Sequence, residues 1–99
     1  MSLTVYKYTV PVDDRRHAIE LPNPGQITHV IASQLNELTF WALVDRDAPK
    51  NERYFTVVGT GHPIPADVAA VAGTAPVPGM PIVWHLVEVM FASDPSVKE

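Results

Sequence analysis

The segment with the clearest potential for chemistry is Gly59-Thr60-Gly61-His62-Pro63-Ile64-Pro65. Its glycines tolerate positive φ angles and close backbone approach, so successive amide groups can form a concave site for an anion. Thr60 adds a hydroxyl group, and His62 adds a ring nitrogen that can donate to a phosphate or a carboxylate. In the structural alternative, the glycines end a strand with a bulge and the prolines fix the exit of the chain. The candidate ligand-binding residues are Gly59, Thr60, Gly61, His62 and His85.

Histidine spacing gives a second set of hypotheses. No two histidines form a His-x-His or His-x-x-x-His pair, so local zinc-ligand spacing is absent. His85 falls on the apolar face of a predicted strand, where a histidine with satisfied hydrogen bonds is the commoner explanation. A catalytic interpretation would bring His62 and His85 together with an acid such as Glu88. The four histidines are His17, His29, His62 and His85.

The polar segment 45–51, followed by Glu52, holds the densest group of carboxylates. The central glycine of a calcium-binding loop is missing there, and Arg46 and Lys50 lie among the acids. This pattern indicates a solvated loop that neutralises itself, and no metal site is predicted.

Missing motifs argue against several enzyme classes. The sequence has no phosphate-binding loop ending in Gly-Lys-Ser/Thr, no Gly-x-Gly-x-x-Gly, no His-Glu-x-x-His and no Gly-x-Ser-x-Gly. It contains no cysteine, which excludes thiolate metal sites, iron–sulfur clusters and cysteine nucleophiles. We therefore expect a protein that is not an enzyme and uses no cofactor.

Charge and hydropathy restrict the partners. Seven Lys and Arg residues against 11 Asp and Glu give a net charge of -4, which argues against a nucleic-acid partner. No apolar run approaches the roughly 20 residues of a membrane helix, so no membrane partner is expected. The first residues lack the charged and apolar regions of a signal peptide. With the absence of cysteine, this predicts a cytoplasmic protein.

The composition favours many short strands. Val, Ile and Thr make up 26 of the 99 residues, and the ten prolines confine regular structure to short stretches. Alternating polarity predicts a hairpin from the first two strands, and the run 38–44 is apolar on both faces, as in a central strand covered on two sides. Val68 and Val71 are spaced i, i+3 within 66–72, which predicts one short helix there. The predicted strands span residues 4–10, 16–21, 27–33, 38–44, 54–58, 73–77 and 82–90.

These elements predict an all-β fold, or a mainly β fold with one short helix. The architecture is a small antiparallel β-sandwich or partly open barrel of six to seven strands. We expect one domain over residues 1–92 and a flexible polar tail over residues 93–99. Trp41 and Trp84 lie in the most apolar segments and are predicted to be mostly core residues, marking an interface if they are exposed.

Several blocks of the sequence resemble a family of short uncharacterised proteins of bacteriophages and bacteria. The block from Gly59 to Ile64 is the most specific of them, and the resemblance covers about residues 5–89. No activity is implied by it, only a phage or prophage setting. Residues 75–80 are less typical of the family. The blocks are Lys7-Tyr8, WALVD (41–45), APK (48–50), VGTGHPI (58–64) and VWHLVE (83–88).

We therefore expect a non-enzymatic β-module of phage or prophage origin in the bacterial cytoplasm, homo-oligomeric, that binds a small anionic ligand or a host protein. The alternatives are a structural or virion accessory protein and a histidine-dependent enzyme. Self-association is expected through a sheet edge or face, because the segment 82–90 has no proline, one charge and two apolar faces. Packing of residues 66–72 on its second face is the alternative.

Overall fold

The computed structural model describes residues 1–95, which form strands joined by turns and loops. These residues contain no helix, and so none that is long and apolar enough to cross a membrane. Residues 96–99 of the predicted tail lie outside the described part of the chain. The strands are β1 (Leu3–Pro11), β2 (His17–Pro22), β3 (Pro24–Gln34), β4 (Glu37–Asp45), β5 (Lys50–Gly59), β6 (Val68–Pro76) and β7 (Val83–Val89).

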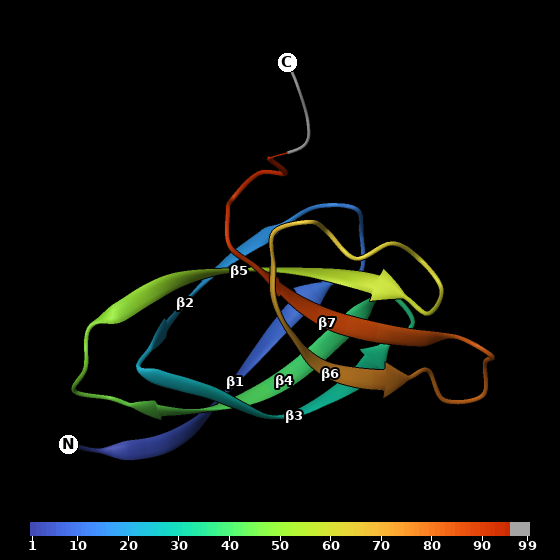
Figure 1. Ribbon diagram of the computed structural model, residues 1–99. Coiled ribbons are helices and arrows are strands. Elements are labelled where there is room, and N and C mark those ends of the chain that lie inside the picture. Colours follow the sequence, from blue (N-terminus) through green and yellow to red (C-terminus); the bar gives the residue numbers. More distant parts are fainter. Residues whose placement is uncertain (96–99) are drawn as a thin grey trace.

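The strands form two antiparallel sheets packed face to face (Figure 1). The three-stranded sheet has the order β1-β4-β3, and the four-stranded sheet has the order β2-β5-β7-β6. Neither sheet closes into a barrel, and β3 lies beside β6 where the sheets meet on one side (Figure 1). The prediction of an all-β sandwich is confirmed.

The predicted hairpin of the first two strands is wrong. β1 pairs with β4 and β2 pairs with β5, so the two strands belong to different sheets. Alternating polarity identifies one buried face per strand but does not identify the partner strand. Here the buried residues Val10 and Leu21 belong to opposite layers of one core instead of adjacent strands.

The predicted helix over residues 66–72 is also wrong, because β6 begins at Val68 and runs through this segment. Its pairing with β7 shifts register between Val68 and Ala70 and again between Val71 and Gly73. Such bulges interrupt the alternation that identifies a strand. Val68 and Val71 are 38% and 53% exposed, so their spacing does not mark a buried helical face.

The core lies between the sheets and is centred on aromatic rings. Phe40 of β4 packs on Phe55 of β5 with ring centroids 5.3 Å apart, and Tyr8 stacks on Phe40 at the same distance. The inward face of β4 is fully buried, as predicted. Its outward face is not: Trp41 and Leu43 are only half-buried, because strand neighbours such as His29 shield them in place of a second layer.

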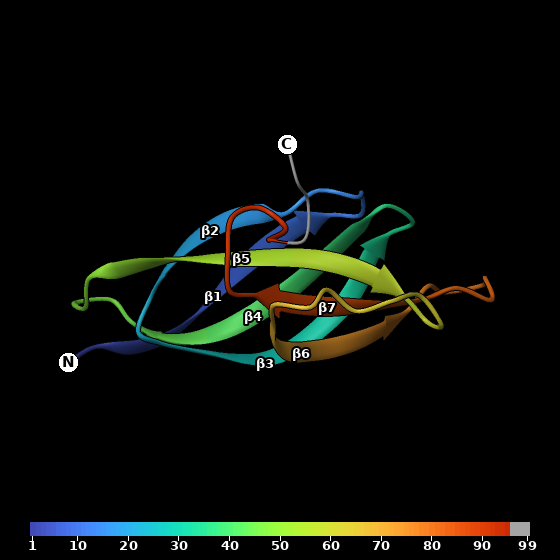
Figure 2. The same cartoon turned by 45° about the horizontal axis from the view of Figure 1, so that its top comes forward.

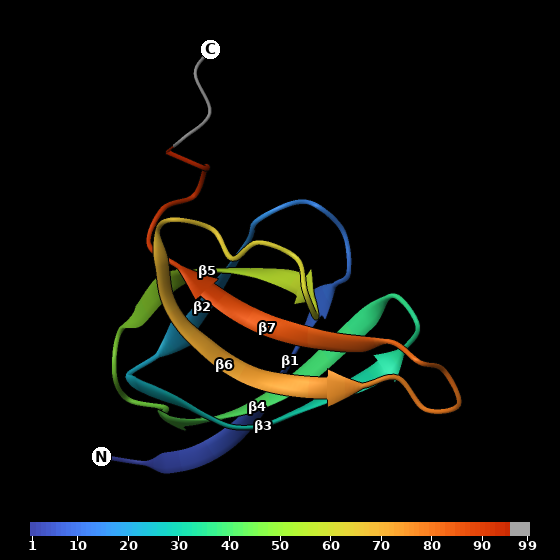
Figure 3. The same cartoon turned by 45° about the vertical axis from the view of Figure 1, so that its right-hand side comes forward.

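β7 lies inside the four-stranded sheet, between β5 and β6, so it offers no free edge for self-association. Val87 and Val89 on its outer face are 0% and 3% exposed and cluster with Val58. β5 and β6 run in the same direction, so the connection 60–67 must return across the sheet. It passes over β7 on the outside of the sheet (Figures 2 and 3). The second face is therefore covered within one chain.

A buried ion pair fixes the end of this connection. Both terminal nitrogens of the Arg16 guanidinium donate to the Asp67 carboxylate, at 2.7 and 2.8 Å, and the two side chains are 9% and 4% exposed. Arg16 also donates to the carbonyl oxygens of Phe91 and Ser93, and the Phe91 amide donates to Asp67. The hydrogen bonds from Arg16 lower the pKa of the Asp67 carboxyl. The pair thus joins the approach to β2, the start of β6 and the chain after β7.

We predict that Asp67→Asn lowers the thermal unfolding midpoint at pH 7 by roughly 10 °C or more, because the buried Arg16 loses the carboxylate that accepts both of its terminal N–H bonds. Because the pKa of Asp67 is lower in the folded state than in the unfolded state, its carboxylate stabilises the folded state fully at pH values above the unfolded-state pKa. This contribution is lost as the pH falls through the folded-state pKa. The difference from the wild type should therefore shrink from about pH 4 downward. Asp14→Asn, at an exposed carboxylate, is the matched control. A pH-independent difference would contradict the ion-pair explanation.

Gly73 of β6 allows the close approach of the two sheets on the β3–β6 side. A Cβ atom there would overlap with the side chain of Val30 in β3. Val30 is 7% exposed and belongs to the main core.

We predict that Gly73→Ala lowers the free energy of unfolding by about 1–3 kcal/mol, because the added methyl group overpacks this contact. Chemical denaturation measures the change. The double variant Gly73→Ala/Val30→Ala should be less destabilised than the sum of the two single variants, since the smaller side chain makes room. Strict additivity of the two single effects would contradict direct contact.

Candidate functional site

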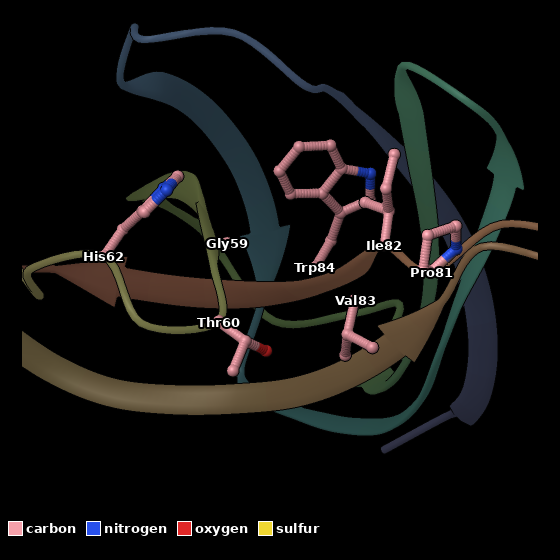
Figure 4. Close-up of a pocket in the computed structure, with 7 residues that line it drawn as sticks. All are labelled: Gly59, Thr60, His62, Pro81, Ile82, Val83 and Trp84. Carbon is pink, nitrogen blue, oxygen red and sulfur yellow. The ribbon is translucent and has the colours of Figure 1, made fainter.

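A concave pocket of about 410 Å³ opens at the end of the sandwich, where β5 ends and β7 begins (Figure 4). The two strands bring its walls together, because Gly59 is the register partner of Trp84. A tight turn follows Gly59, with the His62 amide donating to the Gly59 carbonyl at 3.1 Å and Gly61 at a φ of 87°. The lining residues are Gly59, Thr60, His62, Pro81, Ile82, Val83 and Trp84.

Two rings flank the missing side chain of Gly59. A Cβ atom at this position would lie 3.2 Å from Nδ1 of His62 and 3.4 Å from Cζ3 of Trp84. The side chains of His62 and Trp84 extend to the same side of the strand pair (Figure 4). The indole is held in place, since its Nε1–H donates to the Leu35 carbonyl in the β3–β4 turn at 3.2 Å. The arrangement is a slot with an indole on one side and an imidazole on the other.

Thr60 and Val83 extend to the opposite side of the strand pair (Figure 4). There the Thr60 hydroxyl lies 2.7 Å from Nε2 of His85, and the Thr74 hydroxyl lies 3.0 Å from Nδ1. Both ring nitrogens of His85 therefore have partners from β6 and from the end of β5. His85 does not line the pocket, and it holds Thr60 instead of facing a ligand.

The backbone of the Gly59–His62 turn is largely committed to its own fold. The Thr60 amide donates to the Val83 carbonyl at 3.3 Å, and the His62 amide donates to the Gly59 carbonyl. The amides of Thr60 and His62, which an anion at this turn would need as donors, are thus already hydrogen-bonded within the protein. Contacts with a ligand would come from the side chains of His62 and Trp84, and Gly61 serves as the positive-φ position of the turn.

The hypothesis that His62, His85 and Glu88 form one site is wrong. Glu88 accepts two hydrogen bonds from Arg53, at 2.7 and 2.8 Å, and Arg53 also donates to the Gly25 carbonyl. The reason is the two-residue period of a strand, which puts residues 85 and 88 on opposite faces of β7. Glu88 faces Arg53 of the neighbouring strand, on the side of the sheet away from His85.

In the loop 45–51, the carboxylate of Asp45 forms hydrogen bonds within the fold. Asp45 Oδ1 accepts hydrogen bonds from the amides of Ser2 and Asp47, both at 3.0 Å, and these bonds lower the pKa of Asp45. Residues 1–95 contain no group of three or more His, Cys, Asp and Glu side chains that could hold a metal ion.

The turn was identifiable from the sequence, but the other wall of the pocket was not. Trp84 was predicted to be mostly a core residue, and it does pack against the core, yet it is half-buried because one side faces the pocket. Pro81 and Ile82 complete that wall. The only signal for this wall in the sequence is Gly59 at the end of a strand. Because glycine has no side chain, it leaves the ring of Trp84 in the partner strand uncovered.

The family model described as a domain of unknown function, DUF7352, matches residues 1–95. The chain belongs to this family, and the resemblance to an uncharacterised family is confirmed to that extent. No match was found among the curated proteins or among the solved structures.

Proposed function

We propose that this protein is a binding module, not an enzyme, and that its ligand is a small planar molecule with one anionic group. The slot between Trp84 and His62 carries the proposal. A flat ring stacks on the exposed side of an indole with a favourable free energy of about 0.5–1.5 kcal/mol beyond its buried area. The indole needs no rearrangement for this, because Leu35 already holds it in place.

The lining favours a ligand with one charge over a highly charged one. Pro81 and Ile82 provide an apolar wall, and no Lys or Arg is among the lining residues. His62 provides the ring nitrogen that can donate to a carboxylate or another acceptor. An aromatic carboxylate fits these features better than a phosphate ester, which needs several donors or cations.

The same contacts favour binding over catalysis. The polar side chains of the lining are Thr60, His62 and the indole N–H of Trp84. The Thr60 hydroxyl is paired with His85, and the indole N–H is paired with Leu35. This leaves His62 as the side chain available to a ligand, without a second group positioned to exchange a proton with it.

The resemblance of the sequence supports the rest of the proposal. On that basis we place the protein in phage or prophage biology, in the cytoplasm of a bacterial host, where a host protein is the alternative ligand. A virion accessory role would predict co-purification with particles instead of retention of a small molecule.

We predict that benzoate shifts the ¹H–¹⁵N signal of the Trp84 indole and leaves that of Trp41 unchanged, in a titration followed by NMR spectroscopy. Trp41 lies on the outer face of the three-stranded sheet and is an internal control. Neutral benzamide has the same ring and should bind more weakly. Gly59→Ala should weaken benzoate binding by about tenfold or more, because the added methyl group enters the slot.

Trp41→Phe is the matched variant outside the pocket and should bind benzoate like the wild type. Equal shifts of both indoles, or no shift of Trp84 at low millimolar benzoate, would contradict the proposed ligand class. Equal affinity for benzoate and benzamide would contradict only the proposal that the ligand carries an anionic group, and not the proposal that it is planar.

A further inference from the structure

β1 is an edge strand whose outer backbone groups lack a strand partner within residues 1–95. It pairs only with β4, and the nine register pairs from Leu3 to Pro11 run without a shift. The Arg46 amide donates to the Ser2 carbonyl, and the Val12 amide donates to the Asn36 carbonyl. Hydrogen-bonded pairs alternate along an antiparallel ladder, so even-numbered residues of β1 bond to β4. The backbone groups of Leu3, Val5, Lys7 and Thr9 therefore point away from the sheet.

The other edge strands are protected. β2 has six residues and ends at Pro22, which has no amide hydrogen. β3 and β6 both contain register shifts, and they lie beside each other with Gly73 against Val30. Bulges and covering elements are the usual means by which proteins block edge-to-edge pairing. Among the strands of residues 1–95, β1 is the long and regular edge without such protection.

Several apolar side chains along this edge are exposed. Leu3 is 53% exposed, Val5 is 52% exposed and Tyr6 is 41% exposed. Lys7 is the one charged residue of β1. A strand with this composition can pair with its own copy, provided that the two Lys7 side chains do not face each other.

We propose that β1 pairs antiparallel with β1 of a second copy of this chain, across a two-fold axis at Tyr6. In this register Leu3 faces Thr9 of the partner subunit, and Val5 faces Lys7 of the partner subunit. All four outward residues then form hydrogen-bonded pairs, with about eight hydrogen bonds in total. The two three-stranded sheets become one continuous sheet of six strands.

Neighbouring registers satisfy the edge less well. An axis at Lys7 brings the two ammonium groups together and sets Leu3 opposite Pro11 of the partner subunit, which has no amide hydrogen. An axis at Val5 moves Thr9 opposite Met1 of the partner subunit, beyond the start of the strand. The axis at Tyr6 also makes a cross-strand pair of two tyrosine rings, which favours association.

This surface is separate from the pocket, because β1 belongs to the three-stranded sheet and the pocket is formed by β5 and β7. Loss of the dimer therefore leaves benzoate binding unchanged, and failure of benzoate binding leaves the dimer unchanged. The two proposals can be rejected independently.

Sedimentation of the full chain at micromolar concentration should give a species of twice 10.9 kDa. Val5→Pro removes an outward amide without touching the β1–β4 ladder, and it should weaken dimerisation by about tenfold or more, since two symmetry-related hydrogen bonds are lost. Val5→Thr keeps the amide and the branched shape and is the matched control. A wild-type monomer at all concentrations, or a folded Val5→Pro variant that dimerises normally, would overturn the proposal.

A cysteine cross-link tests the register even if Val5→Pro does not fold. The chain has no cysteine, so Tyr6→Cys introduces a single thiol. At a non-hydrogen-bonded pair the two Cα atoms lie about 4.5 Å apart, within the range that a disulfide spans. Thr9→Cys lies on the same edge, but its two copies would be about 20 Å apart in this register. Disulfide dimers from Tyr6→Cys alone would support the proposal, and equal or absent cross-linking of both variants would overturn it.

Discussion

The parallel run of β5 and β6 is the constraint on which the rest of the structure depends. With β7 between them, the chain must cross from one end of the four-stranded sheet to the other, and the crossing segment covers Val87 and Val89. The ion pair of Arg16 and Asp67 holds the end of that crossing against the sheet. Its start is the Gly59–His62 turn. The turn that forms one wall of the pocket is thus the first part of a connection that the topology requires.

Strand positions were readable from the sequence, and strand partners were not. Alternating apolar residues identified the strands around Val10, Leu21 and Phe40, because burial of one face is a local property of a strand. Pairing depends on contacts between distant residues, so the adjacent first strands were wrongly joined into a hairpin. The prediction of a helix over residues 66–72 was wrong for a different reason. Its bulges removed the alternation, and two exposed valines imitated helical spacing.

The candidate site divides in the same way. Gly59, Thr60 and His62 were identified because glycine-rich turns are a local signal, and all three line the pocket. Trp84 was missed as a pocket residue, because its exposure depends on a glycine in the partner strand. Glu88 was grouped with His85 from proximity in sequence, although three residues along a strand reverse the face. Local signals therefore revealed half of the pocket, and register supplied the other half.

Most contacts of residues 1–95 are satisfied within the fold, which gives weight to two places where they are not. Prolines end β2 and β6, bulges interrupt β3 and β6, and Arg53 and Glu88 neutralise each other within the fold. An aromatic ring with one side facing a pocket and an open backbone edge both leave favourable contacts unused. A chain of 99 residues buries a smaller fraction of its unfolded surface than a larger domain does, so such contacts matter more to it. A ligand at Trp84 and a second copy at β1 would each make use of one of them.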